Sequence, residues 1–350
     1  MVDQRILTVL LFISIALVAL SGCVNDESYD HSHSHRIEST RVAMNTDVAI
    51  TVIHQNASVA ESAIDCAFAE VYRIAHLMSH TEGVELSEVA RLNKNGFLPN
   101  ASLDLQYLVD KSIEHSRFSN GSFDITVLPI INLWKERMRA GSPPTDDEIN
   151  ETLKLVNYRN ISIENNSIHF SQKGMEITLG GIAKGYAIDR AIAVLQEHGI
   201  KDALVNAGGD IRAIGNKEEG APWVIALRNP ENKTEYLTII HPDNMSVATS
   251  GNYERYFSEE ARTSHIIDPK AGYAACELLS VTVVAETATD ADALATAVFV
   301  LGEARGMDLI ERLDGVEGLI VTGDRQVLRS SGFASFEDSR ALPDADTNTT

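Results

Sequence analysis

The sequence predicts an α+β fold with mixed, largely antiparallel sheets. Alternating apolar and polar residues over Thr40–His54 are typical of a strand. Apolar residues recur at helical spacing over 58–80 and predict an amphipathic helix. The later short strands are spaced too irregularly for a doubly wound parallel sheet. Between the polar ends lie about 300 residues of ordinary apolar content, enough for one large domain or two fused lobes.

The other elements follow from the same periodicities and from turn residues. Helices are expected over 103–119, after the capping residue Thr145, from Gly180-Gly181 to Gly199 and over 289–301. Strands are expected over 161–163, 168–170, 176–179, 203–205, 211–214, 223–227, 235–240, 245–249 and 279–285. The three segments from 223 to 249 are expected to form a meander. Cys66 falls within the first helical pattern and is expected in the core.

The N-terminus predicts export and a lipid anchor. An apolar run from Ile6 to Leu20 is short for a membrane span and suits a secretion signal. Ser21-Gly22-Cys23 follows and resembles a lipoprotein box in which Cys23 is lipidated. We expect a signal peptide at 1–22, a polar tether at 23–36, the folded domain at 37–335 and a disordered acidic tail at 336–350. The protein is then extracytoplasmic and anchored to the cell membrane. The alternative is an uncleaved signal anchor.

Charge and surface motifs limit the class of partner. The net charge of −21 argues against nucleic acid. An acidic protein that binds an anionic ligand needs a local cation, although the acidity also fits a solubility adaptation. Glycosylation triplets, in which Ser or Thr follows Asn two residues later, exceed the roughly two or three expected by chance. They begin at Asn56, Asn100, Asn120, Asn150, Asn160, Asn165, Asn232, Asn244 and Asn348.

The segment Thr178–Arg190 predicts an anion site where a strand gives way to a helix. Gly180 and Gly181 permit a close backbone approach, and the first helical amides are expected to point outward. Lys184 lies one turn into the helix, where it can meet a phosphate. The competing interpretation is a tight turn beside a solvated lysine.

Two further segments carry hard oxygen ligands and a titratable imidazole. A carboxylate and a hydroxyl lie four residues apart on one helical face, at Asp292 and Thr296, and both are suitable ligands for Mg²⁺. The alternative interpretation is that Asp290 and Asp292 only stabilise the start of the helix. His265 precedes an Asp268-Pro269 turn and can act as a general base or a phosphate contact, although a lone histidine is more often structural.

Three glycine-containing turns are further candidates for site residues. Ser122-Phe123-Asp124 could frame an aromatic ring and a ribose, or form only a hydrophobic turn. Gly208-Gly209-Asp210 and Ser250–Tyr253 are further turns that combine glycine with polar residues.

The order of these motifs resembles the ApbE-type FAD:protein FMN transferase family from about Thr40 to Gly332. The resemblance rests on the segments Met44–Thr46, Ser87–Asn93, Gly121–Thr126, Leu179–Asp189, Asn206–Asp210, Ala248–Tyr253, Ser264–Pro269 and Ala291–Thr296. It implies two intertwined α/β lobes and makes 37–335 the transferase domain.

The resemblance also implies ligands and roles. FAD is expected among Met44, Ser122, Phe123, Asp124, Thr178, Lys184, Ile266 and Ala295, and Mg²⁺ at Asp292, Thr296 and the carbonyl oxygen of Gly181. The sequence departs from the usual family pattern at two places. Asn45 replaces a usual glycine, and His80 and Thr81 occupy the place of a flavin-stacking tyrosine.

The implied reaction transfers FMN to a Thr or Ser hydroxyl of an acceptor protein and releases AMP. Mg²⁺ and Lys184 are expected to stabilise the charge on phosphate, with His265 as the preferred general base and Asp268 as the second candidate. The acceptor expected by analogy is a redox subunit of an Rnf- or Nqr-type complex. The alternatives are an FAD pyrophosphatase that uses the same site and a flavin-binding lipoprotein without catalysis.

Overall fold

The computed structural model describes residues 34–80, 86–232, 234–252 and 266–338, together with strand residues 256–258 and 263–264. The expected signal peptide, Cys23, His265 and residues 339–350 of the expected tail lie outside the described residues. Within the described part, no helix combines the length and the apolar character needed to cross a membrane. The first strand begins at His35, inside the segment expected to be a tether.

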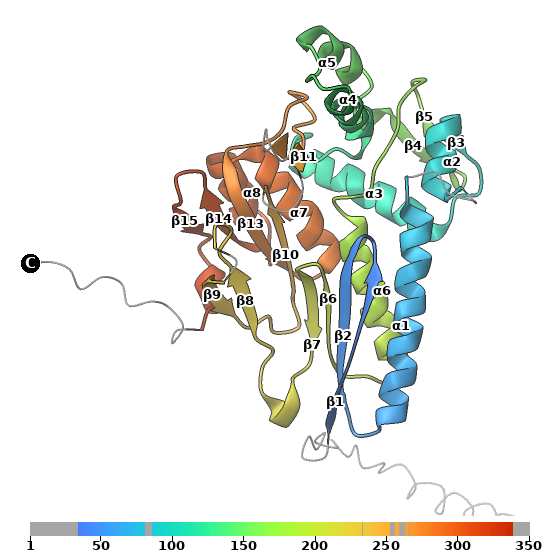
Figure 1. The fold of residues 1–350 in the computed structure, drawn as a ribbon. Helices are drawn as coiled ribbons and strands as arrows, with labels where there is room; N and C mark the ends of the chain where they lie inside the picture. The colour runs from blue at the N-terminus through green and yellow to red at the C-terminus, as the bar shows by residue number, and fades with distance from the viewer. Residues whose placement is uncertain are drawn as a thin grey trace, which may run out of the picture.

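One eight-stranded antiparallel sheet forms the centre of the molecule, in the order β1-β2-β6-β7-β10-β13-β14-β15 (Figure 1). Its strands are β1 His35–Ala43, β2 Thr46–His54, β6 Asp202–Ala207, β7 Asp210–Ile214, β10 Ser246–Gly251, β13 Leu278–Ala285, β14 Glu317–Thr322 and β15 Val327–Arg329. Every neighbouring pair is antiparallel. The expectation of an α+β protein with largely antiparallel sheets is confirmed.

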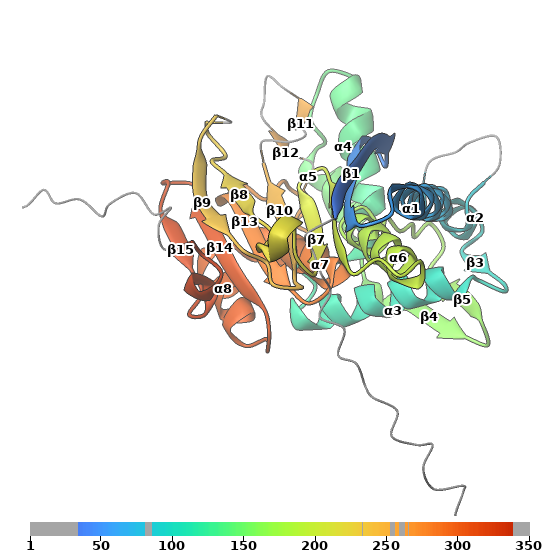
Figure 2. The same ribbon diagram turned by 90° about the horizontal axis from the view of Figure 1, so that it is seen from below.

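Four helices cover one face of this sheet. They are α1 Ala57–Met78, α6 Ala183–Glu197, α7 Ala288–Leu301 and α8 Glu303–Glu311, and each contacts the next (Figures 1 and 2). The opposite face is partly covered by a two-stranded sheet of β8 Ile225–Arg228 and β9 Tyr236–Ile240, whose Ile225, Leu227 and Ile240 pack against Val247 and Leu319. The main sheet is therefore buried between two layers at its centre.

A second part of the molecule is inserted between α1 and α6. Its elements are α2 Glu88–Asn95, β3 Phe97–Leu98, α3 Leu103–Phe118, α4 Leu128–Arg139, α5 Asp146–Leu153, β4 Ile161–Glu164 and β5 Ser167–Phe170. The chain leaves the main sheet after β2 and α1 and returns to it through α6 and β6. A small pair, β11 Tyr256–Ser258 and β12 Thr263–Ser264, also lies outside the main sheet.

Four local expectations are corrected. Thr40–His54 is part of a hairpin of two strands, because Met44 and Asn45 form a turn with left-handed φ values of 53° and 61°. Residues 176–179 are not a strand. The expected meander is split, since β10 joins the main sheet while β8 and β9 pair apart from it. Cys66 is exposed, because it lies on the solvent-facing side of α1.

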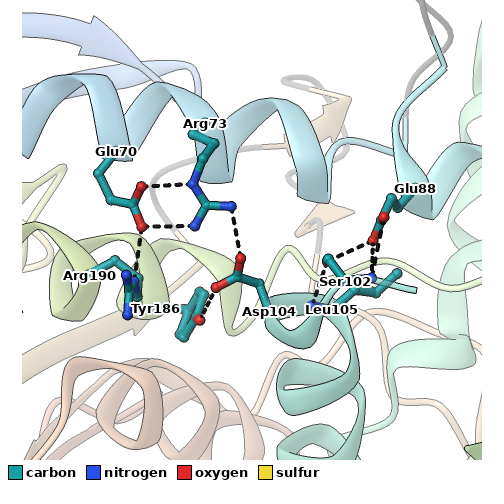
Figure 3. A network of polar contacts seen from close by, with 8 residues as sticks. All are labelled: Glu70, Arg73, Glu88, Ser102, Asp104, Leu105, Tyr186 and Arg190. Atoms are coloured by element: carbon teal, nitrogen blue, oxygen red, sulfur yellow. Dashed lines mark hydrogen bonds and ion pairs between the residues drawn. The ribbon is translucent and has the colours of Figure 1, made fainter. Parts of the chain in front are cut away.

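A polar network joins α1, α3 and α6 at one side of the fold (Figure 3). Arg73 donates to both carboxylate oxygens of Glu70 at 2.7 and 2.8 Å and reaches Asp104 at 2.8 Å. Tyr186 donates to the other Asp104 oxygen at 2.5 Å, and Arg190 donates to Glu70 at 2.9 Å. Burial and the Asp104 carboxylate raise the pKa of Tyr186, so its hydroxyl remains a donor. The network fixes α6, whose start carries Lys184.

Candidate functional site

A cavity of about 540 Å³ opens where the main sheet meets the inserted part, a volume in the usual range for small-molecule sites. Residues from many separate parts of the chain line it. They include Met44 and Asn45 of the β1–β2 turn, His80 after α1, Ser122, Phe123 and Asp124, Lys135 of α4, Thr178, Gly180 and Gly181, Lys184 of α6, Thr249 and Ser250 of β10, Ile266, and Asp292 and Thr296 of α7. Most of the expected site residues are thus brought together.

Oxygen atoms gather at the end of the cavity formed by α7. Asp292 is 6% exposed, and Thr296 lies one turn further along the same helix. The Ser250 and Thr296 hydroxyl oxygens are 3.3 Å apart. A Cβ built on Gly181 would lie 3.2 Å from the Thr296 hydroxyl, so the Gly181 backbone is adjacent to it. One carboxylate and two hydroxyls beside the Gly181 backbone form a set of hard oxygen donors.

A buried charge cluster flanks these oxygens. Asp210, 1% exposed, forms an ion pair with the Lys184 ammonium, and its other oxygen accepts the Thr249 N–H at 3.2 Å. Burial raises the pKa of Asp210, and the Lys184 charge opposes that rise. Burial and the neighbouring Asp210 carboxylate raise the pKa of Asp292 to about 7. Two carboxylates therefore share one cation here, and the site favours an additional positive charge.

The starts of α6 and α7 are held together by the Lys184–Asp189 segment. The Gly185 N–H donates to Asp292 at 3.0 Å, and a Cβ on Gly185 would lie 2.0 Å from the Ala288 carbonyl oxygen. Asp189 accepts the N–H groups of Ala288 and Thr289 at 3.0 and 2.9 Å and so caps α7. The motif residues around Lys184 thus position Asp292 as well as the lysine.

The turn at 122–128 forms another wall of the cavity. The buried Asp124 carboxylate accepts the N–H and hydroxyl of Thr126 at 2.9 and 2.6 Å and the N–H of Tyr158 at 2.9 Å. Burial raises the pKa of Asp124, although these hydrogen bonds oppose the rise. Phe123 is 4% exposed, and its ring edge would be 3.3 Å from a Gly181 Cβ. Asp124 therefore holds the turn, and Ser122 and Phe123 line the cavity.

The far end of the cavity carries cationic and imidazole groups. His80 lies 3.4 Å from the Thr178 hydroxyl through Nδ1. Burial, with a smaller contribution from Lys135, lowers the pKa of His80. Burial and the neighbouring Arg139 lower the pKa of Lys135. A second hollow of about 640 Å³ shares His80, Leu128 and Lys135 with the first.

Some expected site residues lie elsewhere or act differently. Ala295 is fully buried in α7, in the hydrophobic core. The half-buried Asp268 accepts the Lys270 N–H at 2.8 Å through its carboxylate and belongs to a turn, outside the described lining of the cavity. The expectation that the first α6 amides point outward is wrong for Ala183 and Gly185, because they donate to Leu179 and Asp292.

Sequence reasoning did not assign site roles to Asp210, Ser250 or Lys135. The first two lie in glycine-containing segments recognised as polar turns, on neighbouring strands of the main sheet. Ser250 lines the cavity, whereas the buried Asp210 acts on it through its ion pair with Lys184. Lys135 carries no local motif, because it is one of several charged residues on α4.

Comparison with known proteins gives one family. A sequence profile of the ApbE family matches residues 44–320. The FAD:protein FMN transferase of Vibrio cholerae is 35% identical over 264 residues, which covers 73% of this chain and 77% of that protein. The transferase of Haemophilus influenzae is 32% identical over 261 residues, or 71% of this chain and 75% of that protein.

Solved structures agree with the sequence matches. The ApbE protein of Thermotoga maritima superimposes with a TM-score of 0.80 at 33% identity, over 87% of this chain and all of that one. The flavin transferase ApbE of Vibrio cholerae gives a TM-score of 0.73 at 29% identity, over 87% of this chain and 99% of that one. Since the profile spans most of the sequence and the relatives exceed 30% identity, this chain belongs to the ApbE family.

Proposed function

We propose that this protein is an FAD:protein FMN transferase. FAD binds in the 540 Å³ cavity, and its FMN half is transferred to a hydroxyl of a second protein. The observation that carries the proposal is the meeting of Lys184, Asp292, Thr296 and Gly181 at one end of a cavity in a chain of the ApbE family. A lysine beside hard oxygen donors suits a diphosphate linkage.

The reaction is a displacement at phosphorus. The oxygen of an acceptor Thr or Ser attacks the phosphorus of the FMN half, and the bond from that phosphorus to the bridging oxygen breaks. AMP leaves with that oxygen, and a general base takes the hydroxyl proton. One phosphoester and one AMP form for each FAD consumed.

The residues at the α7 end fit a divalent cation, and we assign Mg²⁺. Asp292, Thr296 and the Gly181 carbonyl offer only oxygen ligands, which is the preference of Mg²⁺. The raised pKa of Asp292 supports this assignment, because burial without enough positive charge disfavours its anion. When bound, the ion would neutralise charge on the diphosphate and on the departing AMP.

Lys184 and the apolar wall supply the remaining stabilisation. The Lys184 ammonium, held by Asp210, adds positive charge on the phosphate side of the cavity. Phe123, Leu128 and Ile131 exclude water from the space beside the ring system. His80 occupies the wall where an aromatic group would contact the flavin. Met44 and Asn45 form the adjoining turn, and asparagine tolerates the left-handed φ of 61° there.

We assign the general base to His265, with Asp268 as the second candidate. An unperturbed imidazole titrates near working pH and can accept the hydroxyl proton. His265 lies outside the described residues, and the assignment rests on the resemblance of the Ser264–Pro269 segment.

The proposal extends to partners and location on the basis of sequence features and family resemblance. The acceptor is a membrane-associated redox subunit of Rnf or Nqr type, by analogy. A signal peptide at 1–22, lipidation of Cys23 and a tether at 23–36 would place the domain on the outer side of the cell membrane. No nucleic acid is involved, given the net charge of −21.

One assay separates this function from its two alternatives. The purified protein is incubated with FAD, Mg²⁺ and a purified candidate acceptor subunit, and the products are analysed by mass spectrometry. Transfer yields an acceptor heavier by one FMN, together with free AMP. A pyrophosphatase yields free FMN and AMP, and a binding protein returns intact FAD. Omission of the acceptor and addition of chelator serve as controls.

A further inference from the structure

Asparagine in this chain is unusually often part of an Asn-x-Ser/Thr triplet. Nine of its 20 asparagines are followed two residues later by Ser or Thr, with no proline between. With 49 serines and threonines in 350 residues, about three such triplets arise by chance. Neither FAD binding nor the fold accounts for this excess of triplets, because the triplets are spread over different helices, strands and turns.

The structure places the acceptor asparagines on the surface. Eight of the nine lie within the described residues, and each of these eight is exposed or partly exposed. None of the eight is among the described residues that line the cavity. The exposed asparagines are Asn56, Asn100, Asn120, Asn150, Asn165 and Asn244, and the partly exposed ones are Asn160 and Asn232. A glycan on these amides would project into solvent.

The hydroxyl partners of the eight described triplets form two groups: two hydroxyl residues are buried, and six are exposed or partly exposed. Ser122, the partner of Asn120, is 4% exposed and lines the cavity. Ser246, the partner of Asn244, is completely buried and donates to the Glu286 carbonyl oxygen at 3.3 Å. Ser58 and Thr234 are exposed, and Ser167 is partly exposed. A transferase that reads the hydroxyl on the folded protein reaches only the second group.

Three of the accessible triplets begin at a helix start or in a turn. The Asn56 side-chain oxygen accepts the Val59 N–H at 3.2 Å and caps the start of α1. Asn165 occupies the tight turn between β4 and β5. That hairpin lies at the periphery of the molecule in both views (Figures 1 and 2). The Asn232 side-chain oxygen accepts both the N–H and the hydroxyl of Thr234, at 3.1 and 2.7 Å.

We propose that this protein is N-glycosylated after folding at Asn56, Asn165 and Asn232, and is unmodified at Asn120 and Asn244. A separate glycosyltransferase supplies an activated sugar whose anomeric carbon carries a phosphate leaving group. The Asn Nδ2 forms a bond to that carbon and loses one proton, and the phosphate leaves with the electron pair of the broken C–O bond. No oxidation or reduction occurs. This modification does not depend on FMN transfer.

The test uses protein isolated from the membranes of its native cells. Proteolytic peptides that contain each triplet are analysed by mass spectrometry, and protein made in a host without N-glycosylation serves as the reference. Peptides with Asn56, Asn165 and Asn232 should be heavier by a sugar chain that chemical deglycosylation removes. Peptides with Asn120 and Asn244 should have the mass given by their sequence.

Matched variants produced in the native cells test the recognition. Ser167→Ala removes the triplet without disturbing the left-handed turn at Asn165, and Ser167→Thr retains it. The first should abolish the mass increase at Asn165, and the second should preserve it. Unmodified peptides at Asn56, Asn165 and Asn232 would overturn the proposal. Equal modification of Asn120 and Asn244 would overturn the claim that transfer follows folding.

Discussion

The Asp210 carboxylate on β7 and the Lys184 ammonium on α6 form an ion pair at the edge of the cavity. The strand residue is 1% exposed, so its charge is compensated inside the protein. The helix residue lines the cavity, so its charge also faces the ligand space. The pair fixes a flexible lysine in one position, which is the requirement for electrostatic stabilisation of a reacting phosphate.

Asp210→Asn should weaken the use of FAD. The substitution preserves side-chain size but removes the charge that holds Lys184, so we expect kcat/KM for FAD to fall about 10- to 100-fold. AMP release measures the rate, and quenching of flavin fluorescence measures FAD binding. Asp210→Glu restores the charge and should recover part of the loss. Unchanged kcat/KM in Asp210→Asn would show that Lys184 acts without this partner.

Thr296→Ala should raise the Mg²⁺ concentration needed for activity. The variant loses a hydroxyl beside Asp292 and Gly181, and we expect at least a ~10-fold increase in the half-saturating concentration of Mg²⁺. Thr296→Ser keeps the hydroxyl and should remain close to the wild type. Titration of activity with Mg²⁺ measures the effect. A similar Mg²⁺ response in both variants would contradict the assignment of Thr296 as a ligand.

Gly185→Ala should unfold the junction between α6 and α7. The added Cβ would lie 2.0 Å from the Ala288 carbonyl oxygen, and backbone must move to relieve this contact. We expect the free energy of unfolding to decrease by about 3 kcal/mol or more. At Gly180 a Cβ meets only the Thr178 hydroxyl at 3.4 Å, so Gly180→Ala is the matched control. Urea denaturation compares them, and equal midpoints would refute the close approach.

Stability should depend on pH and Mg²⁺ together through Asp292. Burial and the Asp210 carboxylate raise its folded pKa from 3.8 to about 7. The contribution of Asp292 to the free energy of unfolding is therefore fully present below pH 3.8 and is lost as the pH rises through 7. We expect the metal-free protein to lose on the order of 2–4 kcal/mol across this window.

Thermal unfolding with Mg²⁺ and with chelator measures this linkage. Mg²⁺ favours the ionised carboxylate, so its stabilising effect should grow as pH rises. In Asp292→Asn, the stabilisation by Mg²⁺ should hardly increase with pH. If the wild type and Asp292→Asn gain equally from Mg²⁺ at low and high pH, Asp292 does not hold the ion.

His265→Ala should slow FMN transfer while FAD binding is maintained. Loss of a general base costs about 10²–10⁴ in rate. Asp268→Asn, by comparison, should affect mainly the turn in which its carboxylate accepts the Lys270 N–H. Rates of acceptor labelling are measured for both variants beside binding affinities for FAD. An unchanged transfer rate in His265→Ala removes this histidine from the mechanism.

Local patterns anticipated most of the helices and strands. The apolar spacing of α1, the capping box of Thr145 and Glu148, and the glycine after α6 each act within a few residues. The local pattern of residues 176–179 predicts a strand, but a strand also needs a neighbouring strand with which to pair. Cys66 falls within the helical pattern yet is exposed, because helical spacing alone does not fix the width of the buried face.

The sequence by itself determined the family resemblance, the elements, and the motifs that contain Lys184, Asp292 and Thr296. Only the tertiary structure decided that Asp210 pairs with Lys184, that the Gly185 amide is committed to Asp292, and that Ala295 lies in the core. The physical reason is that residue types and spacing express short-range preferences. Charge pairing, burial and close backbone contact depend on which distant segments the fold brings together.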